Sequence, residues 1–106
     1  MEINEVKKDT YNLLNVNGRL DSTTAPEFEK ALLNSIDAAK ENLVNFKDLK
    51  YISSSGLRVL LVAAKKLSAT GKKLTITAMQ DHIKEVFDIS GFTGLFNILP
   101  ENPYEQ

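Results

Sequence analysis

The 106-residue chain contains no cysteine, no tryptophan and a single histidine. Without thiols it can form neither disulfide bonds nor thiolate metal sites, and one histidine among scattered carboxylates gives no metal-ligand spacing. No apolar stretch approaches the ~20 residues needed to cross a bilayer. Residues 1–5 also lack the basic-then-apolar order of a signal peptide. We therefore expect a cytoplasmic protein with no metal, no cofactor and no membrane partner.

The chain also lacks a marked excess of charge of either sign. It carries 13 basic and 14 acidic side chains, a formal net charge of -1, and no basic cluster stands out. Nucleic-acid binding usually requires such a cluster, so no direct contact with nucleic acid is expected. The length suits one domain, residues 1–106, around one hydrophobic core, with residues 100–106 as a loose tail.

Apolar periodicity predicts strands alternating with helices. Strands are expected at 3–6, 11–20, 43–46, 74–78 and, as a short final strand, in the apolar stretch 92–98. Helices are expected after 21–27, from 57 and over 81–90. Asn17-Gly18 fits either a hairpin turn or a bulge, and Asp48 to Tyr51 is expected to be a connection. This order predicts an α/β fold with parallel strand pairing wherever a helix crosses over.

The most informative segment is the run from Tyr51 to Arg58, in which three serines and a glycine precede an apolar helix. Serine is a preferred N-cap because its side-chain oxygen accepts a hydrogen bond from a first-turn amide. The same helix end favours negative charge, so a phosphate on a serine would be accommodated there. The pattern is thus compatible with an ordinary helix start or with a covalent switch.

An enzyme is not expected. The chain has no Gly-x-Ser-x-Gly elbow, and its one histidine, His82, follows Asp81 at a helix start, where a solvated position is expected.

Three motifs in order resemble the STAS domain, the module of bacterial anti-sigma factor antagonists. They are Gly18-Arg19-Leu20-Asp21 with Thr24 and Pro26, the run from Tyr51 to Leu61, and Phe87 to Phe92 followed by Leu95 to Ile98. The resemblance covers nearly the whole chain. It implies a mixed sheet of four to five strands flanked by helices.

The resemblance also implies partners: an anti-sigma serine kinase, which the antagonist binds to free a sigma factor, and a metal-dependent serine phosphatase. By position the phosphoacceptor is Ser55, with Ser54 as second choice. The expected partner-binding residues are Asp21, Ser53, Ser54, Ser55, Gly56 and Arg58. A monomer is expected for a small switch that exchanges partners. The alternative is a STAS-type binding subunit of a stress-signalling or lipid-transport complex, without phosphorylation.

Two positions depart from the family pattern. Ser53 stands where the family often has aspartate, and Asn45 stands where the strand before the loop often ends in aspartate. Gly56 is expected to let a partner approach the loop closely. Its replacement by valine would then impair binding and leave the melting temperature nearly unchanged.

Overall fold

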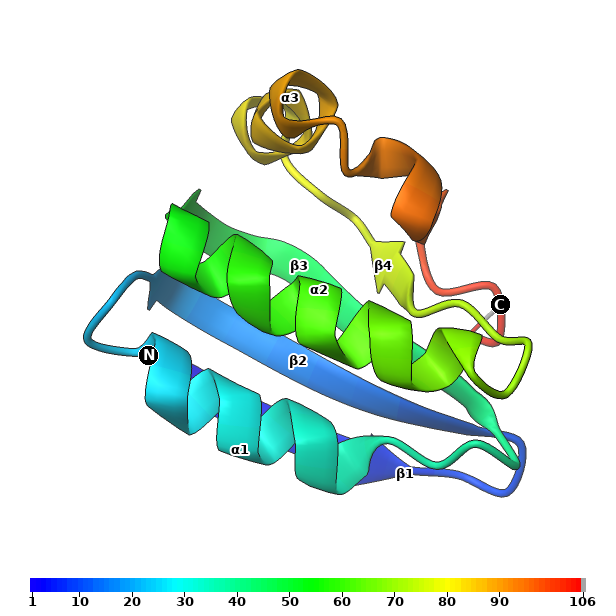
Figure 1. Ribbon diagram of the computed structural model, residues 1–106. Helices are drawn as coiled ribbons and strands as arrows, with labels where there is room; N and C mark the ends of the chain where they lie inside the picture. The colour runs from blue at the N-terminus through cyan, green and yellow to red at the C-terminus, as the bar shows by residue number, and fades with distance from the viewer. Residues whose placement is uncertain (106) are drawn as a thin grey trace.

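The computed structural model describes residues 1–105 and shows a five-stranded sheet whose parallel strands are connected along the chain by helices (Figure 1). Within these residues the strand order is β1-β2-β3-β4-β5. β1 pairs antiparallel with β2, and every other neighbouring pair is parallel. The elements are β1 (Glu2–Lys7), β2 (Tyr11–Leu20), α1 (Ala25–Ser35), β3 (Glu41–Ile52), α2 (Ser54–Ser68), β4 (Thr75–Thr77), α3 (Asp81–Ser90), the 3-10 helix η1 (Thr93–Leu95) and β5 (Asn97–Leu99). The predicted mixed α/β sheet is confirmed.

The three helices and one face of the sheet form the main hydrophobic core. α1 and α2 lie side by side over the sheet, and α3 lies beyond β4 (Figure 1). Residues from every helix and from β2, β3 and β4 share this core, including Phe28, Phe46, Leu60, Ile76 and Phe87, each fully buried. α2 is buried along most of its length, which fixes the position of both its ends.

The β2–β3 ladder is irregular near Asn17-Gly18. Asn15 pairs with Asn45 but Asn17 with Asp48, and the register shifts again between Gly18 and Arg19. β2 continues through this region, so the hairpin interpretation is excluded. The structure instead has bulges, and their extra residues lie in β3.

Two sequence-based expectations about chain segments are wrong. β3 does not end near residue 46 but continues to Ile52, so the expected connection at 48–51 is part of a strand. The C-terminal segment is not entirely loose, because the Tyr104 ring stacks on Tyr11 with ring centroids 4.7 Å apart. Tyr11 belongs to a small second apolar cluster with Leu13 and Leu43 on the other sheet face. Residue 106 lies outside the described residues.

Candidate functional site

The motif residues converge where β2 and β3 end side by side. Leu20 pairs with Ile52, and the Ser53 amide donates to the Leu20 carbonyl at 2.9 Å. Asp21 and Ser53 therefore leave two adjacent parallel strands at the same edge of the sheet. This is the edge where α/β folds commonly build their sites.

The serines form the N-terminus of the buried helix α2. Ser53 is the N-cap residue with extended backbone, and the first intrahelical bond runs from the Leu57 amide to the Ser53 carbonyl at 3.0 Å. The amides of residues 54–56 precede that bond, so they belong to the unpaired set at a helix start. Ser54 is exposed and Ser55 half-buried. Both hydroxyls thus lie beside amides suited to an anion.

The predicted side-chain cap is not made. The Ser53 Oγ is buried, yet it has no hydrogen-bond partner among residues 1–105. The first-turn amides of α2 therefore lack the side-chain hydrogen bond that an N-cap serine usually provides.

Gly56 is required by packing within the chain itself. It is buried, and a Cβ atom built there would lie 2.6 Å from Leu20 Cγ and 3.0 Å from Ile52 Cγ1. The backbone of α2 therefore rests directly on the end of β2. The expectation that valine here would leave the melting temperature nearly unchanged is wrong, because the side chain would collide with the core.

Asp21 organises the turn between β2 and α1. Its Oδ1 accepts hydrogen bonds from the Thr23 hydroxyl at 2.7 Å, the Thr23 amide at 3.0 Å and the Thr24 amide at 3.2 Å. These bonds, the Thr23 hydroxyl first, hold the pKa of the Asp21 carboxyl below its usual value near 3.8. The carboxylate is thus held within the turn that follows β2, and it is charged at neutral pH.

We expect Asp21→Ala to lower the melting temperature at pH 7 and to lose that effect in acid. A carboxyl with a lowered native pKa stabilises the fold above its unfolded pKa, and that contribution is lost as the pH falls through the native value. The gap between wild type and variant should narrow below about pH 3.8, the usual value. Thermal unfolding followed by circular dichroism at a series of pH values measures it. Asp9→Ala, in an exposed turn, is the control, and a gap independent of pH would contradict the prediction.

Two arginines flank the site. The Arg19 guanidinium lies 4.3 Å from the centroid of the Tyr51 ring, and its Nε is 3.9 Å from Asp21 Oδ2. Arg58 is exposed, and its Nη2 lies 3.9 Å from Glu29 Oε1 on α1. On a helix, residue 58 shares a face with residues 54 and 55, which stand four and three positions earlier. A phosphate on either serine would therefore lie within reach of a cation.

Arg19 and Tyr51 were not among the predicted site residues, although both stand within the quoted motifs. Tyr51 is a large aromatic residue that is nevertheless 41% exposed. Its place beside Arg19 can be inferred only once β3 is known to extend past residue 46. The structure brings together Asp21, the three serines and Gly56, with Arg58 one turn further along α2.

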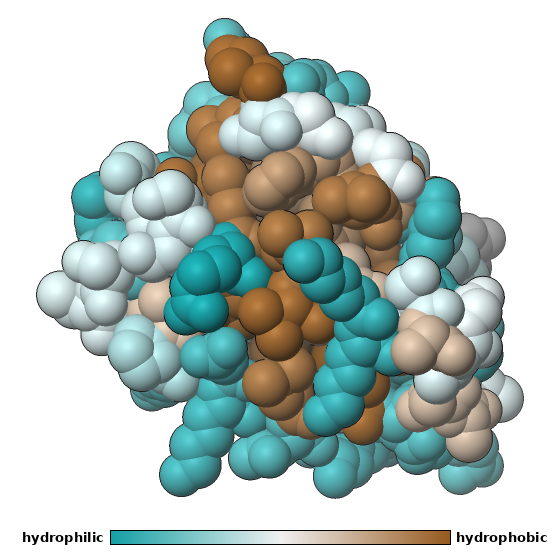
Figure 2. Space-filling model, viewed as in Figure 1, coloured by the Kyte–Doolittle hydropathy of each residue, from teal (hydrophilic) through white to brown (hydrophobic). Residues whose placement is uncertain are grey.

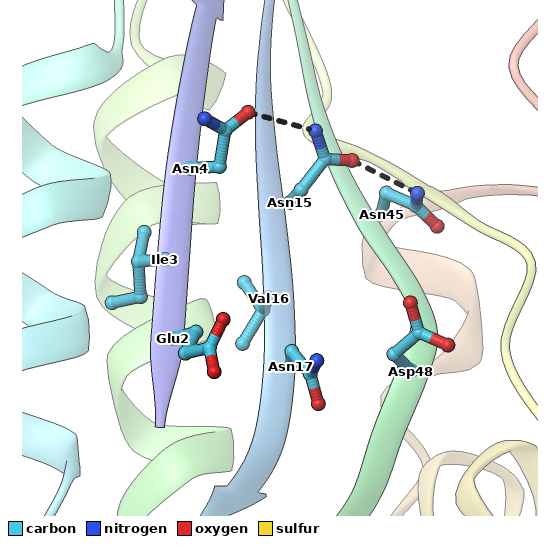
Figure 3. Close-up of a pocket in the computed structure, with 8 residues that line it drawn as sticks. All are labelled: Glu2, Ile3, Asn4, Asn15, Val16, Asn17, Asn45 and Asp48. Atoms are coloured by element: carbon cyan, nitrogen blue, oxygen red, sulfur yellow. Dashed lines mark hydrogen bonds between the residues drawn. The ribbon is translucent and has the colours of Figure 1, made fainter.

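Two other features lie apart from these residues. His82 is exposed, as expected, and its Nε2 is 2.8 Å from the Lys50 carbonyl oxygen. Asn45, which the sequence resemblance matches to an aspartate at the end of a strand, lies within β3 rather than at its end. Its amide donates to Asn15 Oδ1 at 2.9 Å, and the Asn15 amide donates to Asn4 Oδ1 at 3.3 Å (Figure 3).

This row of amides borders a hollow of about 520 Å³ on the sheet face away from the main core. Glu2, Asn17 and Asp48 line it as well (Figure 3). None of the predicted site residues lines it. Because the three amides bond to one another, the row acts as a tie across β1, β2 and β3.

Comparison with known proteins decides the family. Residues 2–102 match the STAS domain family model. The chain belongs to the STAS domain family. It is 33% identical over 99 residues to BtrV of Bordetella bronchiseptica, provisionally named an anti-sigma factor antagonist, covering 92% of this chain and 85% of that one. It is 29% identical to the anti-sigma-B factor antagonist of Staphylococcus aureus, covering 92% of each chain.

The STAS fold is also seen in solved structures. Bacillus SpoIIAA in its phosphorylated form superposes with a TM-score of 0.72 at 18% identity, covering 98% of this chain and 94% of that one. At this identity the likeness establishes the fold. Within residues 1–105 of the STAS chain, no helix has the length and apolar character needed to span a membrane.

Proposed function

We propose that this STAS protein is an anti-sigma factor antagonist that binds an anti-sigma serine kinase, frees the sigma factor and is switched off by serine phosphorylation. The observation that carries the proposal is the α2 N-terminus. It presents two serines that are not buried, Ser54 and Ser55, beside unpaired amides, at the sheet edge where Asp21 follows the adjacent strand β2. The names of the relatives and the phosphorylated form of a structural neighbour support it.

The proposed surface combines the turn of residues 53–58 with Asp21. Arg19 and Tyr51 extend it, because the arginine bridges the aromatic ring and the carboxylate. Gly56 contributes by bringing the serines close to β2 rather than by touching the partner. The proposal assigns the protein a binding role, without catalysis of its own.

Phosphorylation would act on the interface rather than on the fold. A phosphoserine adds roughly -1.5 to -2 charges and three acceptor oxygens. The first-turn amides and Arg58 can accommodate these within the chain. Across the interface, the same charge would face desolvation and repulsion from an acidic or tightly packed partner surface.

We expect one phosphate on Ser55, or on Ser54, after incubation with ATP and the cognate anti-sigma-type serine kinase of the source organism. Intact mass and fragment mapping measure it, and a metal-dependent serine phosphatase should remove it. Ser55→Ala and Ser54→Ala identify the acceptor, because only one of them should abolish the mass gain. Absence of phosphate with every such kinase, on folded protein, would favour the constitutive binding subunit instead.

A further inference from the structure

Basic side chains gather around the second half of α2, although the chain as a whole carries nearly equal numbers of basic and acidic residues. Six of the 13 basic residues and none of the 14 acidic ones lie in residues 49–80. Four of the six, Lys65, Lys66, Lys72 and Lys73, stand at or just after the C-terminal end of α2. Such one-sided charge is a property of a binding surface rather than of the fold.

The same region contains an apolar groove between α2 and η1. Its volume is about 210 Å³, and Figure 2 shows apolar surface running over this face beside hydrophilic side chains. Leu61 and Ala64 of α2 and Leu95 of η1 form its apolar lining. Three lysines also line the groove: Lys65, Lys72 and Lys73. Leu95 is 43% exposed, so the apolar lining faces solvent.

Part of the lysine charge is available to a partner. Lys72 Nζ lies 3.2 Å from Glu41 Oε1, and the Lys73 ammonium donates to the Gly94 carbonyl at 3.2 Å. Lys65 has no carboxylate within 4.0 Å among the residues that the structure describes. At least Lys65 and Lys73 therefore carry charge that no acidic side chain of residues 1–105 neutralises.

We propose that this groove is a second protein-binding surface that receives an acidic, amphipathic segment of a partner. Charge complementarity requires acidic residues opposite the lysines, and the apolar lining requires one or two aliphatic anchors. The volume lies below the ~300–1,000 Å³ typical of small-molecule pockets, which favours a side chain over a whole ligand. A recess is also less suited to a flat membrane surface than a protruding apolar residue would be.

The groove is separate from the serine site, and it operates in both phosphorylation states. Lys65, the first lysine of the groove, stands ten residues after Ser55 along α2, a distance of about 15 Å. That is about two Debye lengths at physiological salt, so a charge at Ser55 is largely screened at the groove. The chain could thus remain attached to one partner through the groove while the serine site exchanges another.

A designed peptide tests the proposal without an identified partner. The probe is an acidic, Ala/Glu-rich helix of about 18 residues with two leucines four positions apart, since shorter isolated helices are marginal in water. It is titrated into ¹⁵N-labelled full-length protein. We expect amide shifts centred on Leu61, Lys65 and Leu95, and no binding of a Lys-for-Glu version of the peptide.

Matched variants separate the groove from general charge. Lys65→Glu with Lys73→Glu should weaken peptide binding about tenfold, and Leu95→Ser should weaken it as well. Lys30→Glu on α1 and Ile89→Ser, an apolar residue 79% exposed outside the groove lining, should not. Ser55→Asp should bind the peptide like wild type, which keeps this test independent of the proposed switch.

Four results would overturn the proposal. The first two are no groove shifts with the acidic peptide and equal weakening by the Lys30→Glu control. The third is binding to phosphatidylglycerol vesicles that displaces the peptide and that Leu95→Ser abolishes, and the fourth is self-association in sedimentation that Lys65→Glu abolishes. The third would assign the groove to a lipid surface and the fourth to a second copy of this chain.

Discussion

Gly56→Val is expected to destabilise the fold by about 3 kcal/mol, well beyond the effect of an ordinary surface substitution. A Cβ atom at residue 56 would lie 2.6 Å and 2.9 Å from two atoms of the Leu20 side chain. Leu20 is fully buried and Ile52 is 4% exposed, so neither neighbour can move into solvent. α2 would have to shift away from β2, which would loosen the core around the helix that contributes the most buried residues.

The helix propensity of the new residue acts in the opposite direction but is smaller. Replacing glycine in a helix by alanine normally gains about 0.5–1 kcal/mol. Gly56→Ala should therefore lose about 1–2 kcal/mol net, between wild type and valine. For a chain of this size each 1 kcal/mol lowers the melting temperature by roughly 4–8 °C.

Urea unfolding followed by circular dichroism measures both variants, with Gly94→Ala as the matched control. A Cβ at Gly94 would meet no atom within 4 Å, so that substitution should change stability by less than about 0.5 kcal/mol. An unchanged urea midpoint for Gly56→Val would mean that Leu20 repacks without cost. It would support the original expectation that Gly56 is needed only for the close approach of a partner.

Gly56 illustrates what the sequence could not reveal. A glycine after three serines at a helix start is compatible with a flexible loop, a close partner or a close contact within the chain. Only the position of the Leu20 side chain decides among them. Leu20 is 36 residues away in sequence, and the contact depends on the parallel pairing of Leu20 with Ile52.

The order of elements was predictable because the apolar periods are clear. β1, β2, α1, α2 and α3 lie close to where the pattern places them, and α3 ends at Gly91 in left-handed conformation. The second half of β3 was missed for a physical reason. Its buried residues, Phe46, Leu49 and Ile52, are three apart rather than two, because the bulged register breaks the alternation of a regular strand.

Other features required three dimensions. Tyr104 packs on Tyr11 across 93 positions of sequence, a pairing that no local pattern signals. The lysines of the groove already stand in a segment without acidic residues, but no local pattern places this segment beside an apolar groove, which forms only where the end of α2 and the following turn meet η1. The serine site was the more predictable, since its residues are contiguous and its Asp21 neighbour begins a recognisable helix-start motif.

Phosphorylation at Ser55 is expected to weaken binding of the cognate anti-sigma kinase by about 100- to 1,000-fold, equivalent to about 3–4 kcal/mol. The added charge would be well tolerated by the fold. It lies at the N-terminus of α2, where the helix dipole and unpaired amides favour anions by roughly 0.3–1 kcal/mol. The phosphate would therefore weaken the interface rather than the fold, because its charge must be desolvated against the partner surface.

The substitution Ser55→Asp mimics the phosphate. We expect it to lower kinase affinity by about 10- to 100-fold, less than the phosphate does, because aspartate carries one negative charge rather than roughly 1.5 to 2. Isothermal titration with the kinase measures affinity, and urea unfolding should show equal or slightly higher stability. Asn34→Asp, exposed near the C-terminal end of α1 and outside the groove lining, adds the same charge away from the site. It should leave kinase affinity unchanged. If Ser55→Asp bound as tightly as wild type, charge at the α2 N-terminus could not be the switch. A loss shared by both variants would instead indicate a general response to added acidic charge.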